Sequence, residues 1–186
     1  MNHCCVPNDA APVLETERLI LSGHEAGDFG RLVDVWAEPS VVEHISGKPS
    51  TPRETWMRLL AYKGLWPLLG FGYWAIREKT TSLYVGDLGF ADFHRDVNPP
   101  LRGIPEAGWV LSPSARGRGY ASEALSAALA WLEAQNRFER SVCLISSDNL
   151  PSIRVADKAG YSDGKTVLMN GTETLCFSRT LKGCER

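Results

Sequence analysis

A glycine-containing segment, Arg116-Gly117-Arg118-Gly119-Tyr120-Ala121, lies between an apolar, strand-like stretch and a long stretch with helical periodicity. The N-terminus of a helix exposes unpaired N–H groups and a partial positive charge, and a pyrophosphate fits there. Gly117 and Gly119 let the backbone approach a phosphate closely, while the two arginines add positive charge. This arrangement predicts a strand–loop–helix unit that binds an anion.

Two other nucleotide-binding motifs and a plain turn are the alternative interpretations of this segment. A dinucleotide-binding fold would place G-x-G-x-x-G after the first strand, with an acidic residue about 20 residues further on. Here Ser122 stands at the third glycine position, and the segment lies late in the chain. A P-loop requires G-x-x-x-x-G-K-[ST], which the chain lacks. A plain strand-to-helix turn needs no ligand, so from the segment alone an anion site and a plain turn both stay open.

Hydrophobic periodicity and turn residues divide the rest of the chain into elements. Pro67 and Gly70 are expected to end the second helix, and Asn170-Gly171 to form a hairpin turn. The order β-α-α-β-β-β-α-β-α-β-β indicates a single mixed α/β (α+β) domain at 13–183, after a flexible leader at 1–12. We predict strands at 14–21, 71–78, 83–93, 106–111, 142–145, 165–169 and 173–181, and helices at 25–37, 52–65, 119–135 and 148–160.

Composition narrows the function classes. The 186 residues suit one domain, and a net charge of −2 gives no strong basic field for nucleic acid or anionic lipid. The N-terminus lacks the pattern of a signal peptide, and no apolar run approaches the ~20 residues of a membrane span, so a cytoplasmic protein is expected. The histidines lack metal-site spacing, and so do the cysteines, which we expect to be reduced: Cys4, Cys5, Cys143, Cys176 and Cys184.

Four stretches, taken together, resemble the GNAT acetyltransferase superfamily. The loop motif of the superfamily is [Q/R]-x-x-G-x-[G/A], and Arg116, Gly119 and Ala121 occupy its three fixed positions. The closer resemblance is to the branch of the ribosomal-protein N-terminal acetyltransferases (RimJ/RimL-like). The four stretches are LETERLIL at 14–21, EAGWVL at 106–111, RGRGYASEA at 116–124 and NLPSIRVADKAGY at 149–161.

The resemblance implies a fold and an activity. The fold is a central mixed, mostly antiparallel, twisted sheet of about seven strands with helices on both faces, and its fourth and fifth strands part around acetyl-CoA. The activity is direct transfer of the acetyl group from acetyl-CoA to a primary amine, either a protein N-terminus or a small molecule, without a metal. A homodimer is compatible with the family. The alternative function is a catalytically idle acyl-CoA-binding sensor or scaffold.

The resemblance also implies which residues hold acetyl-CoA. An N–H near Val110 is expected to polarise the thioester carbonyl. Asn149 is expected to contact the pantetheine or pyrophosphate arm, although an Asn at this place is also a natural N-cap for the following helix. The full expected set comprises the pantetheine strand Trp109, Val110 and Leu111, the loop Arg116, Gly117, Arg118, Gly119, Tyr120 and Ala121, and Asn149 with Ser152.

Three residues are candidates for proton transfer. Glu106 begins the strand before the loop and is the expected general base, directly or through water; its alternatives are an edge carboxylate without a task or a binding group for the acceptor ammonium. The resemblance implies Ser152 as the acid for the leaving thiolate; its alternative is a serine that merely faces solvent. Tyr161 is a second acid candidate, and its alternative is to pack where the family usually has Phe, with its hydroxyl at the rim.

Overall fold

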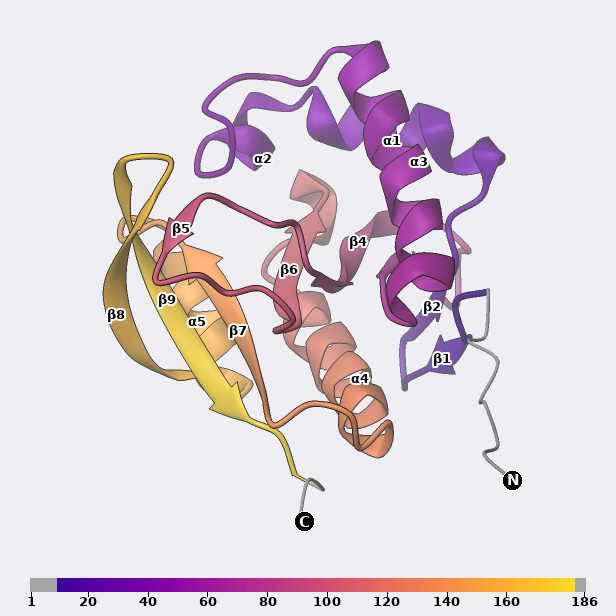
Figure 1. Cartoon of the computed structure of the whole chain (residues 1–186). Helices are drawn as coiled ribbons and strands as arrows, with labels where there is room; N and C mark the ends of the chain where they lie inside the picture. The colour runs from indigo at the N-terminus through magenta and orange to yellow at the C-terminus, as the bar shows by residue number, and fades with distance from the viewer. Residues whose placement is uncertain (1–9, 183–186) are drawn as a thin grey trace.

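The computed structural model describes residues 10–182, which form one nine-stranded sheet with five α-helices (Figure 1). The strands are β1 (Leu14–Glu15), β2 (Leu19–Ser22), β3 (Tyr73–Glu78), β4 (Tyr84–Ala91), β5 (Val97–Asn98), β6 (Glu106–Leu111), β7 (Arg140–Ile145), β8 (Ser162–Met169) and β9 (Thr172–Thr180). The helices are α1 (Phe29–Trp36), α2 (Pro39–Val42), α3 (Pro52–Leu69), α4 (Tyr120–Ala134) and α5 (Leu150–Lys158), with 3₁₀ turns η1 (Ala26–Asp28) and η2 (Pro113–Ala115). Cys4, Cys5, Cys184 and most of the expected leader lie outside the described residues.

The sheet is mixed and mostly antiparallel, as predicted. Its order is β1-β2-β3-β4-β6-β7-β9-β8-β5, and each neighbouring pair is antiparallel except β6 and β7. The described residues contain nine strands rather than the seven predicted. The two additions are very short: β5, which pairs with β8, and a strand produced by splitting the predicted strand 14–21.

Thr16 divides the predicted strand 14–21 into β1 and β2. Its N–H donates to Leu19 O at 3.0 Å, and its Oγ1 accepts from Leu19 N at 2.9 Å. A threonine side chain that bonds to nearby backbone competes with an extended conformation. The chain therefore turns at this point, and Leu14 folds back to pair with Leu21.

The helix α3 begins as the sequence predicts but continues further. Thr51 Oγ1 accepts from Glu54 N at 3.2 Å, and the Glu54 carboxylate accepts from Thr51 N at 2.7 Å, which together form a capping box. The expectation that Pro67 helps to end the helix is wrong, because the helix runs through it. Trp66 is buried and its indole donates to the backbone of β3 at 3.1 Å, which holds the last turn in place. Gly70, with a φ of 75°, ends the helix.

Helices cover both faces of the sheet, as predicted. Successive residues of a strand point to opposite faces, and the side chains of β4 and β6 alternate accordingly between two apolar clusters. Leu88 and Ala107 belong to the cluster that α4 covers, whereas Ala91 and Val110 belong to the cluster that α1, α2 and α3 cover. Within residues 10–182, no helix is long and apolar enough to cross a membrane.

The last two strands form the predicted hairpin. Asn170 and Gly171 have φ values of 50° and 78°, and they connect β8 to β9. Positive φ at both central residues is what a tight hairpin turn of type I′ requires, because its twist matches that of the flanking strands. The hairpin completes the half of the sheet that lies beyond β7.

Candidate functional site

The strands β6 and β7 separate immediately after their first contact. β6 pairs with β4 along its whole length but meets β7 only where Glu106 lies opposite Val142. At that point Val142 N donates to Pro105 O at 3.1 Å. Among the described residues, no strand pairs with the other edge of β6 from Ala107 to Leu111. The expected parting of the fourth and fifth predicted strands is therefore present.

The period of two along a strand shows which backbone groups this edge exposes. Pro105 O points towards β7, so Trp109 and Leu111 turn their N–H and C=O groups the same way. Ser112 N, of the opposite parity, donates to β4. Val110 therefore directs its backbone to β4, and the unpaired N–H groups expected near Val110 belong to its two neighbours.

Two left-handed glycines shape the loop after β6. Gly117 has a φ of 73° and Gly119 a φ of 80°, a conformation that costs an L-residue roughly 1–2 kcal/mol. A Cβ at Gly117 would meet nothing within 4 Å, and one at Gly119 would meet a single arginine nitrogen at 3.5 Å. The glycines are therefore required by backbone conformation rather than by lack of space. They lead into α4, whose first-turn N–H groups have no intrahelical partner.

The side chains of this loop hold it against its neighbours. Arg116 donates to the backbone O of Ser40 in α2 at 3.1 Å. Arg118 forms an ion pair of 2.6 Å with Glu78 at the end of β3, and the Tyr120 hydroxyl donates to the same carboxylate. Arg118 and Tyr120 thus have an internal task, which leaves the backbone of the loop to contact a phosphate.

Glu78 is a site residue that the sequence analysis did not find. It accepts hydrogen bonds from Tyr120, from Thr81 at 2.7 Å and from Arg118. These hydrogen bonds, that of Tyr120 foremost, lower the pKa of Glu78 to about 2. The carboxylate is therefore ionised at neutral pH and balances the charge of Arg118. No local signal marks it, because its partners are distant in sequence.

A second set of contacts holds the first turn of α4. Glu123 accepts from the Thr16 hydroxyl at 2.5 Å and from Arg18 N at 2.9 Å, and it pairs with the Arg18 guanidinium at 2.6 Å. The guanidiniums of Arg18 and Arg118 lie 4.8 and 4.5 Å from the centre of the Tyr120 ring. The first and third stretches of the family resemblance are therefore in direct contact with each other.

The start of α5 lies across from the loop, after β7. Asn149 Oδ1 accepts from Ser152 N at 3.2 Å, so Asn149 is the N-cap of α5. The amide NH₂ of Asn149 and the hydroxyl of Ser152 have no hydrogen-bond partner among residues 10–182 and are available to a ligand. His44, which follows α2, approaches Asp148 at 3.3 Å. The segment after α2 therefore reaches the start of α5.

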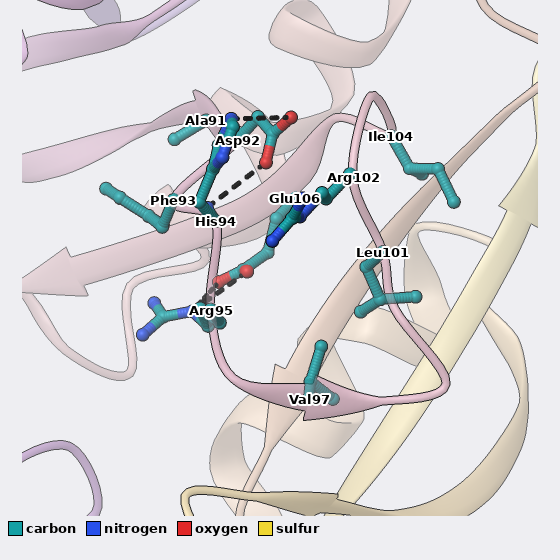
Figure 2. A pocket seen from close by; sticks show the side chains of 10 residues that line it. All are labelled: Ala91, Asp92, Phe93, His94, Arg95, Val97, Leu101, Arg102, Ile104 and Glu106. Atoms are coloured by element: carbon teal, nitrogen blue, oxygen red, sulfur yellow. Dashed lines mark hydrogen bonds and ion pairs between the residues drawn. The ribbon is translucent and has the colours of Figure 1, made fainter.

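Glu106 is buried at the beginning of β6 and ion-paired with Arg95 (Figure 2). Arg95 Nε lies 2.9 Å from each carboxylate oxygen, and the guanidinium lies 4.7 Å from the centre of the Phe93 ring. A carboxylate offers about four lone-pair directions, so Arg95 leaves acceptor capacity for an ammonium or a water. Arg95 is a second site residue that the sequence analysis did not find, because it stands in an irregular loop.

The loop that carries Arg95 frames a hollow beside Glu106. Ten residues line it (Figure 2): Ala91, Asp92, Phe93, His94, Arg95, Val97, Leu101, Arg102, Ile104 and Glu106. Asp92 fixes the shape of the loop, because its carboxylate accepts from His94 N at 3.2 Å and from Gly103 N at 2.7 Å. The two ends of the loop are thereby drawn together next to the buried carboxylate.

A row of aromatic rings covers β6 on the face of α1 and α3. Tyr62 stacks on Tyr73 with ring centres 4.5 Å apart, and Tyr73 lies 6.1 Å from Phe93. The Tyr73 hydroxyl occupies the space that a Cβ at Gly108 would need. Burial raises the pKa of Tyr73, and the charge of Glu106 raises it further. Tyr73 is therefore a neutral hydroxyl beside the middle of β6.

Tyr161 lies in the core. It is 2% exposed, its hydroxyl is 2.8 Å from Ser141 Oγ, and that oxygen donates to Pro105 O at 2.8 Å. Burial raises the pKa of Tyr161. The side chain packs as the alternative expected, except that its hydroxyl is inside the protein and not at a rim.

A buried polar cluster supports the other end of β4. His24 Nε2 lies 2.6 Å from Asp87 Oδ1, and both side chains are fully buried. Trp36 Nε1 donates to Asp87 Oδ2 at 3.2 Å, and the Tyr84 hydroxyl donates to Oδ1. Asp87 faces the same side of the sheet as Val110. No role was expected for it from the sequence.

These elements offer hydrogen-bond donors along a continuous path. The backbone of Trp109 and Leu111 fits the amides of an extended chain, and the glycine loop with the first turn of α4 fits a pyrophosphate. Asn149 presents a further donor from the other side. Within residues 10–182, no group of three or more His, Cys, Asp or Glu side chains is placed to hold a metal.

A family model for the acetyltransferase (GNAT) domain matches residues 18–162. The uncharacterized protein YkkB of Bacillus subtilis (strain 168) is 28% identical over 163 residues, which cover 86% of this chain and 90% of YkkB. An acetyltransferase from Agrobacterium tumefaciens strain C58 has a similar structure, with a TM-score of 0.78 and 28% identity over 91% of this chain and 95% of that chain. RimL, a ribosomal L7/L12 alpha-N-protein acetyltransferase in complex with coenzyme A, shares the fold with a TM-score of 0.75 and 16% identity, over 94% of this chain and 100% of RimL. Because the family model spans the unpaired edge of β6, the glycine loop and α5 together, this chain belongs to the GNAT acetyltransferase family.

Proposed function

We propose that this member of the GNAT family binds acetyl-CoA and transfers its acetyl group directly to a primary amine. One observation carries the proposal: the unpaired edge of β6 leads straight into a left-handed glycine loop at the N-terminus of α4. A strand edge offers amide-pairing groups, and a helix N-terminus offers phosphate-binding ones. Acetyl-CoA carries both kinds of group, in the same order.

The residues that would hold the cofactor fit this assignment. Trp109 and Leu111 would pair their free backbone groups with the pantetheine amides, and Val110 would contribute only its side chain. The N–H groups from Gly117 to Ala121 would hold the pyrophosphate. Asn149 would donate its free amide N–H from the opposite side.

Glu106, Ser152 and the backbone of β6 would serve the chemistry. When bound, acetyl-CoA supplies an acetyl thioester whose C–S bond is replaced by a C–N bond to the acceptor, with release of CoA. Glu106 would bind the acceptor ammonium through its free lone pairs and take a proton from it, directly or through water. A free N–H of Trp109 or Leu111 would stabilise charge on the carbonyl oxygen. The Ser152 hydroxyl, rather than the core-bound Tyr161, would protonate the thiolate.

The decisive assay measures thiol release from acetyl-CoA in the presence of a panel of primary amines, with the N-acetylated product identified by mass spectrometry. Turnover with at least one amine supports the proposal. Binding of CoA without turnover on any amine would favour the idle sensor or scaffold. Thermal stabilisation by ATP or NAD, but not by acetyl-CoA, would contradict the cofactor assignment itself.

Glu106→Gln tests the base. The substitution keeps the shape of the side chain but removes the proton acceptor, so we expect kcat at neutral pH to fall by about 10²- to 10⁴-fold, with CoA affinity largely intact. The matched control is Glu173→Gln, at an exposed position on β9, which should leave kcat unchanged. A wild-type pH–rate profile in Glu106→Gln would remove Glu106 as the base.

A further inference from the structure

The ion pair between Arg95 and Glu106 leaves the four terminal N–H donors of the arginine unused. Arg95 contacts the carboxylate only through Nε, at 2.9 Å from each oxygen. Among residues 10–182, neither terminal nitrogen of this guanidinium has a hydrogen-bond or ion-pair partner. The side chain is 36% exposed, against 11% for Glu106, and Figure 2 shows its terminal nitrogens turned away from Glu106. A planar fork of N–H donors is therefore open beside the proposed base.

An open guanidinium fork has a specific chemical complement. Its N–H groups match the two oxygens of a carboxylate in parallel, and such charge-assisted pairs are stronger than neutral hydrogen bonds. The Phe93 ring lies against the guanidinium at 4.7 Å and restricts its orientation. The Asp92 contacts to His94 N and Gly103 N hold the loop that carries it. The terminal nitrogens of Arg95 are therefore held in one orientation.

The neighbouring charges favour an acceptor of mixed charge. Glu106 has lone pairs left for an ammonium, and Arg95 has donors left for an anion, so the pair presents both signs side by side. A second guanidinium, that of Arg58, lies 3.5 Å from the centre of the Trp36 ring on the same face, and its buried Nη1 has no hydrogen-bond partner among residues 10–182. A polyamine would bring only positive charge to these arginines. A protein N-terminus would bring a neutral peptide carbonyl to the fork.

We propose that the acceptor is a small zwitterion, an amine that also carries a carboxylate, with its ammonium on Glu106 and its carboxylate on the free fork of Arg95. This inference rests on the proposed acetyl transfer and names its substrate class. The bonds made and broken are unchanged: a C–N bond replaces the C–S bond, and Glu106 takes the proton of the ammonium. The product is an N-acetylated acid, together with CoA.

The test compares matched triplets at neutral pH, in each of which only the acid group changes. L-Phenylalanine, L-phenylalaninamide and phenethylamine form one triplet, and L-leucine, L-leucinamide and isopentylamine form another. β-Alanine and γ-aminobutyrate vary the distance between the amine and the carboxylate. We expect kcat/KM for the acid to exceed that for its decarboxylated amine by about 10- to 100-fold in at least one triplet, as one charge-assisted hydrogen-bonded pair predicts.

Arg95→Lys tests the fork, because lysine keeps the positive charge beside Glu106 but not the planar donors. We expect the preference for the acid over its amine to fall about tenfold or more, at an unchanged melting temperature. The matched control is Arg31→Lys on α1, which should retain the preference, since Arg31 is an exposed arginine that pairs with a different carboxylate, Asp34 at 3.8 Å, and does not line the hollow. An equal loss in both variants would show that the effect is not specific to the guanidinium of Arg95 and would overturn its role.

The outcomes separate this inference from the proposed function. Turnover of amines or amides that equals or exceeds that of the matched acids would overturn the zwitterion while the acetyltransferase stands. Acetylation of peptides with a free N-terminus, together with no acetylation of any amino acid, would also overturn the zwitterion and leave the acetyltransferase in place. Absence of thiol release with every amine would remove the acetyl transfer itself, and the inference with it.

Discussion

At the scale of single residues, Gly119 shows how backbone conformation and ligand binding coincide. Its φ of 80° is left-handed, and among residues 10–182 the only atom that a Cβ would meet within 4 Å is Arg18 Nη2, at 3.5 Å. A side chain would thus fit into the free protein with little more than the cost of the conformation, roughly 1–2 kcal/mol. What it would obstruct is the space over the N–H groups of α4, where a pyrophosphate is expected.

Gly119→Glu should therefore abolish CoA binding while the protein stays folded. The new carboxylate fills the loop and repels a phosphate at the same point. Isothermal titration with CoA measures the effect, and chemical denaturation should show a loss of about 1–2 kcal/mol in the free energy of unfolding.

The control is Gly171→Glu, in the hairpin between β8 and β9. Gly171 has a φ of 78° and no atom within 4 Å of its ideal Cβ, so the conformational cost is similar but the loop is untouched. CoA affinity should be that of the wild type. Undiminished CoA affinity in Gly119→Glu would defeat the assignment of the loop.

At the scale of elements, two carboxylates connect α4 and its loop to β3 and to the turn between β1 and β2. Glu78, the last residue of β3, holds Arg118 and Tyr120, and Glu123 holds the turn between β1 and β2 through Arg18. A loop that is fixed in this way keeps its N–H groups oriented before a ligand arrives, which lowers the entropic cost of binding. The arginines then serve mainly to position the loop.

The lowered pKa of Glu78 predicts a specific response to acid. Its hydrogen bonds depress the pKa from the usual 4.5 to about 2, so the stability that it contributes is complete above pH 4.5 and is lost as the pH falls towards 2. Glu78→Gln should destabilise the protein at pH 7. The difference in the free energy of unfolding between wild type and variant should shrink between pH 4.5 and 2.

Urea denaturation at a series of pH values measures this difference. Glu173→Gln is the matched control, and its difference from the wild type should stay near zero throughout the range. If the difference in the free energy of unfolding between wild type and Glu78→Gln stayed constant from pH 5 to pH 2, the hydrogen bonds of Glu78 would not depend on the ionised form of its carboxylate.

At the scale of the whole molecule, the site lies where the two halves of the sheet part. β6, the glycine loop and α4 stand on one side, and β7 with the start of α5 stands on the other. A ligand held by both sides, through Trp109 and through Asn149, adds contacts between halves that share a single strand-pairing point at Glu106 and Val142. Binding should therefore stabilise the fold as one unit.

CoA at 100 times its Kd should raise the free energy of unfolding by about 2.7 kcal/mol, because it binds the folded state alone. The measurement is urea denaturation with and without CoA, and ATP and NAD at the same concentration serve as controls. We expect little change with either control. Equal stabilisation by ATP would point to a general phosphate site rather than one for CoA.

The sequence by itself determined the features that depend on short stretches of chain. Asn170-Gly171 specifies a hairpin because both residues tolerate positive φ, Thr51 starts a helix because its hydroxyl can cap it, and Gly117 and Gly119 specify the loop before α4. The resemblance of four such stretches to the GNAT superfamily implied the mostly antiparallel sheet with helices on both faces, and the family model shows the membership. The physical reason is that local conformation depends on each residue and its near neighbours.

The tertiary structure alone decided the contacts between residues distant in sequence. It also decided one contact between residues closer in sequence, that of Arg95 with Glu106. It carried α3 through Pro67 on the packing of Trp66, and it placed the Tyr161 hydroxyl on Ser141. It formed the ion pairs of Arg118 with Glu78 and of Arg95 with Glu106, although only a loop separates the residues of the second pair. Charge pairs and packing of this kind depend on which surfaces the fold brings together, and no local pattern of residues encodes that choice.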